Sequence, residues 1–143
     1  QRMSAGTGVR HSEFNHSADD RVHFLQIWIK PNEVGIAPGY EEKNFDVASK
    51  TAQLRLIASS DGREGSVLIH QDAAIYASIV DGEDKLDYII TEGRTAYIHL
   101  IRGGITVNGE VIHTGDALKI TDETKLQINN AENAEFLLFD LPY

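Results

Sequence analysis

The strongest chemical signal in the sequence is a histidine followed two residues later by a glutamate, His11 and Glu13. In an extended strand their side chains point to the same face, with Cα atoms roughly 6.5–7 Å apart. An imidazole and a carboxylate placed in this way can bind one cation, and two histidines with one carboxylate form a known site for non-haem Fe(II). Taken alone, such a pair is more often a solvated strand edge than a metal site, so its context must decide.

A second histidine–carboxylate pair, His70 and Asp72, repeats this spacing, and His99 and His113 follow further along the chain. The four residues do not form a recognisable ligand pattern. His99 stands between two apolar residues, which predicts a histidine in the wall of a barrel with one hydrogen-bond partner. We therefore expect no second metal site in this part of the chain.

The elements that must position these side chains are predicted to be β-strands throughout. Short runs of β-branched and aromatic residues alternate with turn-forming residues, a pattern typical of a sandwich or barrel. The run at 22–29 reads as a buried strand, in which Trp28 is expected to be a core residue. The other predicted strands span residues 54–58, 66–70, 74–80, 86–90, 95–102, 105–112 with a central turn, 117–120, 125–129 and 135–141.

The clearest local prediction is a hairpin over residues 105–112. Asn108 and Gly109 lie between two β-branched runs and favour a type I′ turn, which needs positive φ at both central positions. By contrast, residues 30–44 contain two prolines and two glycines without alternation, and they are predicted to connect two β units. Residues 44–52 could hold one short helical turn.

Composition limits the classes of partner. The 143 residues carry a net charge of −9, so direct binding to the phosphate backbone of nucleic acid is not expected. The absence of cysteine excludes disulfides and zinc–thiolate sites. No apolar run approaches the roughly 20 residues of a membrane helix. These features predict a cytoplasmic protein with neither nucleic-acid nor membrane partners.

Residues 2–13, which read Arg-Met-Ser-Ala-Gly-Thr-Gly-Val-Arg-His-Ser-Glu, resemble the pirin family. The segments Gln26-Ile27-Trp28-Ile29 and Tyr40-Glu41 resemble it too, as does the ending from Leu137 to Pro142. Members of this family are bicupins, and several bacterial members are quercetin 2,3-dioxygenases. The resemblance implies an all-β fold of the cupin type, a double-stranded β-helix or jelly-roll-like barrel, preceded by a strand remnant of a second cupin.

The resemblance also implies a division of the chain and a metal site. Residues 1–30 correspond to the end of the N-terminal cupin, residues 31–47 to a linker and residues 48–143 to the C-terminal cupin barrel. His11 and Glu13 match two of four ligands to a mononuclear iron, Fe(II) or another divalent transition metal. Glu13 is also a candidate catalytic base toward a hydroxyl of a flavonol-like substrate.

The other two family ligands are histidines of an upstream His-x-His motif, which this sequence lacks. We therefore expect the chain to be a fragment that binds metal weakly or not at all and is inactive alone. Two hypotheses for the parent protein stay open: a metal-dependent dioxygenase of the quercetin 2,3-dioxygenase type, or an iron-binding regulatory protein. An isolated apolar strand at residues 21–30 is expected to pack on the barrel or form a homodimer contact, while residues 1–20 are expected to be partly mobile.

Overall fold

The structure, a computed structural model, describes all of residues 1–143, and its regular elements are strands apart from one short 3-10 turn, η1 (Arg63–Gly65). The all-β prediction is therefore confirmed. The strands are β1 (Arg2–Ser4), β2 (Gly39–Glu41), β3 (Arg55–Ser59), β4 (Val67–Leu68), β5 (Ala74–Gly82), β6 (Leu86–Ile89), β7 (Arg94–Val107), β8 (Glu110–His113), β9 (Ala117–Ile120) and β10 (Lys125–Pro142).

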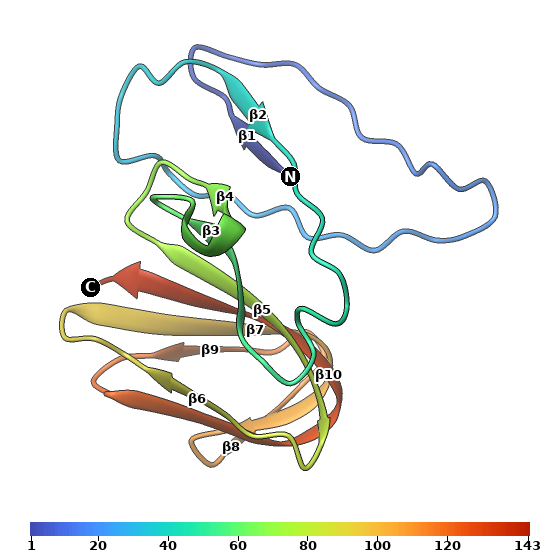
Figure 1. Cartoon of the computed structure of the whole chain (residues 1–143), viewed down its shortest axis with the longest axis vertical. Coiled ribbons are helices and arrows are strands. Elements are labelled where there is room, and N and C mark those ends of the chain that lie inside the picture. The colour runs from blue at the N-terminus through green and yellow to red at the C-terminus, as the bar shows by residue number, and fades with distance from the viewer.

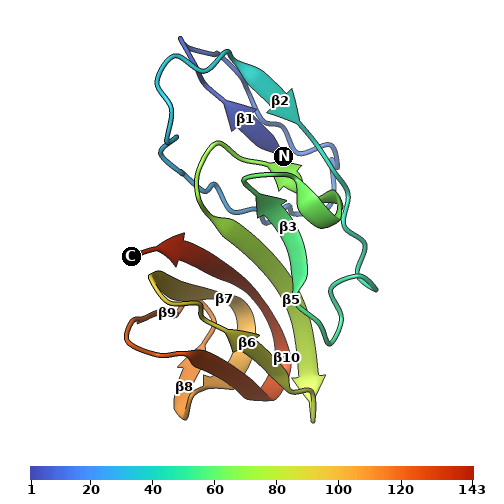
Figure 2. The same ribbon diagram turned by 60° about the vertical axis from the view of Figure 1, so that its left-hand side comes forward.

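Eight of these strands, β3 to β10, form one curved sheet that folds over on itself to enclose a core (Figures 1 and 2). The strand order is β4-β3-β5-β10-β7-β8, with β6 paired to β10 and β9 paired to β7. The pairing is antiparallel except between β3 and β4. The result is the barrel of two facing layers that was predicted.

Two long, bent strands, β7 and β10, belong to both layers and close the barrel. The first half of β7 pairs with β9 and its second half with β8, while β10 pairs with β6 through its first residues and with β5 through its last. The sequence predicted separate strands at 125–129 and 135–141. The structure joins them through a bulged stretch in which Asn130 and Asn133 have positive φ. Two asparagines that tolerate this conformation let the strand bend without ending.

The bend of β7 lies at Gly103, where φ is +83°. A Cβ atom here would lie 2.5 Å from the carbonyl oxygen of Asn133 and would also collide with that of Glu132 on β10. Only a residue without a side chain lets the two bent strands lie this close.

We expect Gly103→Ala to lower the free energy of unfolding by clearly more than about 1 kcal/mol, because it adds a collision with backbone to an unfavourable φ. Gly115→Ala is the matched control: its φ is +88°, but no atom lies within 4 Å of the added Cβ. Urea unfolding of both variants measures the difference. Equal losses of stability would show that the close approach of β7 and β10 adds nothing to the cost of a Cβ atom at position 103.

The core follows the alternation of the strands. A cluster of 14 buried residues fills the barrel, and Leu100, Leu126, Phe136 and Leu138 in it are fully buried. A second cluster of five residues, which includes Val67 and Ile75, lies under β3, β4 and β5. Alternate positions of the same strands thus build the two apolar faces.

The predicted hairpin is confirmed. Asn108 and Gly109 have φ of 48° and 91° between β7 and β8, as a type I′ turn requires. The Asn108 side chain also donates to the Lys125 carbonyl oxygen at 2.9 Å and accepts from the Gln127 amide at 2.7 Å. The turn residue therefore ties the hairpin to β10 as well. The short turn predicted within 44–52 is also present, with the Lys50 and Thr51 amides bonded to the Val47 carbonyl oxygen.

The N-terminal region lies at one end of the barrel, and there the prediction of a strand at 22–29 was wrong. Only β1 and β2 pair in this region, and the loop between them runs extended without strand partners (Figure 1). An apolar, β-branched run forms a strand only where another strand supplies its backbone hydrogen bonds. The core assignment of Trp28 was also wrong, because its side chain is 88% exposed.

The expectation that residues 21–30 pack on the barrel is confirmed in part. Ile29 packs against the second apolar cluster, and the Lys30 carbonyl oxygen accepts a hydrogen bond of 2.7 Å from the Gln71 side chain. A groove of about 280 Å³ separates part of this segment from the barrel, lined by His23, Phe24, Leu25, Ile101, Arg102 and Glu135. The mobility of residues 1–20 stays a prediction, although Arg2–Ser4 within them forms β1.

Candidate functional site

His11 and Glu13 lie in the long loop between β1 and β2, shortly after a tight turn in which the Gly8 amide bonds to the Ala5 carbonyl oxygen at 2.7 Å. The segment that carries His11 and Glu13 is not itself a strand. The structure places His11 Nδ1 and Glu13 Oε1 3.9 Å apart, with the two side chains 41% and 44% exposed. The two side chains therefore point to the same region and remain open to solvent.

This geometry fits part of a metal site. Metal–nitrogen and metal–oxygen bonds are about 2.0–2.2 Å long, so one cation could contact two atoms that are 3.9 Å apart. An imidazole nitrogen and a carboxylate oxygen are also suitable donors for divalent iron or nickel. No group of three or more His, Cys, Asp or Glu residues that could hold a metal is present. The chain thus offers two converging donors.

The four residues considered for a second metal site do not form a group that could hold a metal. Asp72 instead forms an ion pair of 2.7 Å with Arg94. His99 lies in the wall of the barrel on β7, where its side chain is half-buried.

Sequence reasoning missed a polar network at one end of the barrel interior. Arg94 Nε binds Asp140 Oδ1 at 2.5 Å, and the same carboxylate accepts a short hydrogen bond from the Tyr88 hydroxyl. Tyr88 also contacts Tyr76 edge to face, with ring centroids 5.3 Å apart. Burial and the hydrogen bond to Asp140 raise the pKa of Tyr88, so its hydroxyl stays protonated and serves as a donor. Alternation in the sequence could have predicted that each of these side chains points inward. It could not have predicted a contact between Arg94 and Asp140, which are 46 positions apart.

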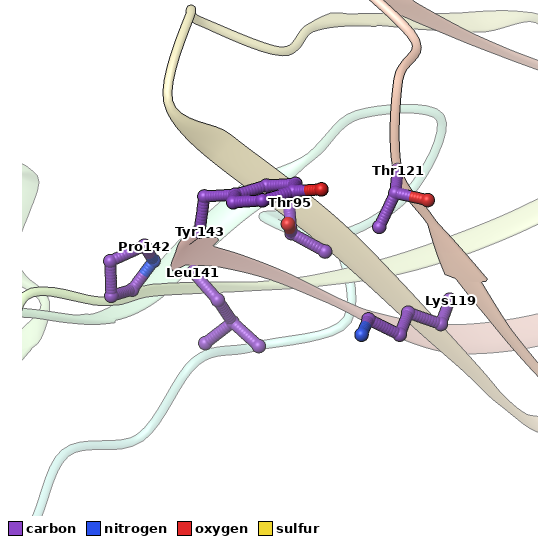
Figure 3. A pocket seen from close by; sticks show the side chains of 6 residues that line it. All are labelled: Thr95, Lys119, Thr121, Leu141, Pro142 and Tyr143. Atoms are coloured by element: carbon purple, nitrogen blue, oxygen red, sulfur yellow. The ribbon is translucent and has the colours of Figure 1, made fainter.

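An open depression of about 380 Å³ lies at the end of β9 and β10 (Figure 3). Figure 3 shows Lys119 and Thr121 on the side opposite Pro142, with the Tyr143 ring between them. No residue of the N-terminal loop lines it. The depression is therefore separate from His11 and Glu13. Its lining is formed by Thr95, Lys119, Thr121, Leu141, Pro142 and Tyr143.

No helix of the structure is long and apolar enough to span a membrane.

The fold defines a cupin-type barrel, and the segment before it carries the converging side chains of His11 and Glu13. Comparison with protein families agrees: residues 56–141 match the quercetinase C-terminal cupin domain, and residues 1–29 match pirin. The chain belongs to the pirin family.

Individual relatives support this assignment. The chain is 42% identical over 142 residues to a quercetin 2,3-dioxygenase of Escherichia coli strain K12, which covers 99% of this chain and 60% of the relative. It is 30% identical over 141 residues to a pirin-like protein of Caulobacter vibrioides, covering 98% of this chain and 60% of that relative. The chain therefore spans about 60% of the length of these relatives.

Solved structures show the same fold. YhhW from Escherichia coli superimposes with a TM-score of 0.75 at 36% identity, covering 80% of this chain and 48% of YhhW. A second crystal structure of this bacterial pirin, in complex with nickel(II), gives a TM-score of 0.72 and covers 78% of this chain and 47% of YhhW. A pirin of the same fold has thus been crystallised with a divalent transition metal.

Proposed function

We propose that this sequence is part of a metal-dependent dioxygenase of the quercetin 2,3-dioxygenase type, and that His11 and Glu13 are two of its four metal ligands. The observation that carries the proposal is the approach of His11 Nδ1 to within 3.9 Å of Glu13 Oε1 in a chain 42% identical to a quercetin 2,3-dioxygenase. The metal would be Fe(II) or another divalent transition metal. A flavonol-like small molecule is the expected substrate.

When bound, a divalent transition metal at such a site supplies Lewis acidity and reactivity toward dioxygen. His11 would contribute one imidazole nitrogen as a ligand. Glu13 would contribute one carboxylate oxygen as a ligand. Its other oxygen can accept a proton from a substrate hydroxyl within hydrogen-bond reach, which makes Glu13 the candidate general base.

We further propose that this chain alone is inactive and that its parts have different roles. The two ligands would come from residues 1–30. A linker of residues 31–47 would join this segment to a supporting barrel, residues 48–143, without a metal of its own. The family matches at 1–29 and 56–141 support this division. Two donors open to solvent are expected to hold a metal far more weakly than four.

The metal site is tested by nickel(II) titration of a full-length pirin that contains this sequence and the upstream His-x-His motif. We expect His11→Ala to weaken nickel binding by more than about 100-fold, since loss of a direct ligand should cost more than loss of an outer partner. His16→Ala is the matched control, because His16 is an exposed histidine of the same loop. Unchanged affinity in His11→Ala would reject His11 as a ligand.

A regulatory or interaction protein is the second candidate, and one observation favours it. Apolar side chains of the N-terminal loop are strongly exposed, among them Phe14, Phe24 and Trp28. Exposed apolar surface of this kind often marks a contact with another protein, including a second copy of the chain. Quercetin consumption that is lost in His11→Ala would support the enzyme, whereas metal-dependent partner binding without turnover would support the regulator.

A further inference from the structure

Strand β4 (Val67–Leu68) ends the sheet, with β3 on one side and no strand on the other. The outward backbone groups of Leu68 are nevertheless satisfied. Glu41 Oε2 accepts a hydrogen bond of 3.0 Å from the Leu68 amide, and Arg2 Nε donates one of 2.9 Å to the Leu68 carbonyl oxygen. Two side chains thus supply the backbone hydrogen bonds that a neighbouring strand would otherwise make with Leu68.

The two side chains are also joined to each other. Arg2 Nη2 lies 3.4 Å from Glu41 Oε2, and Lys43 Nζ lies 2.9 Å from Glu41 Oε1 and 2.6 Å from the Ser66 carbonyl oxygen. The side chains of Arg2 and Glu41 are only 18% and 26% exposed. The hydrogen bond with Lys43, and then that with the Leu68 amide, lower the pKa of Glu41. These charge-assisted bonds to backbone are stronger than an exposed ion pair.

Arg2 lies on β1 and Glu41 lies opposite it on β2, so both belong to the small ribbon beside β4 (Figures 1 and 2). The turn that follows β1 is fixed to the same ribbon. Gly6 has a φ of +54°, and a Cβ atom there would lie 2.7 Å from Pro38. His11 is only three residues beyond Gly8, the end of this turn, which limits their Cα separation to about 10–11 Å. Whatever holds the ribbon therefore restricts where His11 and Glu13 can lie.

We propose that Arg2 and Glu41 are positioning residues that replace a missing strand at the edge of β4 and hold the ribbon leading to His11 and Glu13 at one place on the C-terminal barrel. The role of His11 and Glu13 as metal ligands rests on the proposed function, but the attachment of the ribbon to the barrel does not. Without the pair, the ribbon would keep its own strand pairing and move relative to the barrel.

The test uses the whole chain without metal. Because the sequence has no cysteine, Thr7→Cys and Val111→Cys, both at exposed positions, accept spin labels on the ribbon and on β8. Electron-spin resonance then gives the distribution of distances between ribbon and barrel. In the unlabelled chain, amide hydrogen exchange at Leu68 reports the bond to Glu41.

We expect Glu41→Ala to speed exchange at Leu68 by about tenfold or more and to broaden the distance distribution. Glu41→Gln keeps an acceptor oxygen for the Leu68 amide and should restore most of the protection. Glu42→Ala, the matched control, removes the adjacent carboxylate, which bonds only to the Tyr40 hydroxyl, and should change neither measurement.

Protected amides of Leu100 and Phe136 in Glu41→Ala would show that the barrel is folded. The proposal is overturned if that folded variant keeps the distance distribution of the parent, whether or not Leu68 exchanges faster. It is also overturned if Glu42→Ala has the same effect. Failure of His11 and Glu13 to bind metal would leave both measurements unchanged, so the two proposals can fail separately.

Discussion

Replacing Asp140 with alanine is expected to lower the free energy of unfolding of this chain by about 3 kcal/mol. Asp140 holds Arg94 Nε at 2.5 Å and accepts the hydrogen bond of Tyr88, and the side chains of Arg94 and Asp140 are only 19% and 14% exposed. Removing the carboxylate leaves a largely buried guanidinium without its main counter-charge and the hydroxyl of the half-buried Tyr88 without an acceptor. Both losses cost more than an exposed ion pair contributes.

Asp72→Ala is the control, because Asp72 binds the same guanidinium at 2.7 Å with a side chain that is 66% exposed. Its loss should cost no more than about 1 kcal/mol, since water can replace an exposed carboxylate. Urea unfolding followed by far-ultraviolet circular dichroism measures both variants. Similar losses would mean that solvent reaches Arg94 far more freely than its burial indicates.

Replacing Phe136 with alanine is expected to lower the free energy of unfolding by about 3–5 kcal/mol. Phe136 is the largest fully buried side chain of the barrel, and it lies on β10 between partners on β5 and β7. Its removal leaves a cavity that strands paired on both sides cannot close. The loss combines the transfer of the ring with the cavity that remains.

Phe14→Ala makes the same chemical change at a position that is 87% exposed, and its effect should stay within about 0.5 kcal/mol. The denaturant midpoint and the slope of the transition separate a real loss of stability from a change in the unfolded state. A small effect at Phe136 would show that the barrel repacks around the cavity, contrary to a core fixed by β5, β7 and β10.

Local pattern alone predicted most of the barrel strands, because alternation and turn residues act over a few positions. β9 spans the predicted residues 117–120, and the Asn108–Gly109 turn has the predicted backbone. The spacing of His11 and Glu13 also predicted that their side chains would share a face, since an extended backbone fixes that relation. The ligand assignment itself came from a family resemblance and stays a prediction.

Other features depended on pairings between distant segments, which no local pattern encodes. Residues 22–29 have the composition of a strand, yet without a partner strand they remain extended and Trp28 is exposed. The 125–129 and 135–141 runs became one bent strand because β7 follows the same curve beside them.

Features set by neighbours along the chain could be predicted from the sequence, whereas features set by contacts between distant segments were decided by the tertiary structure. Residue types and spacing predicted most of the barrel strands, the Asn108–Gly109 turn and the shared face of His11 and Glu13, since each depends on neighbours along the chain. Only folding brought Arg94 to Asp140, and Arg2 and Glu41 to Leu68. Those contacts join residues 27 to 66 positions apart, and their energies depend on burial that exists only after the barrel has formed.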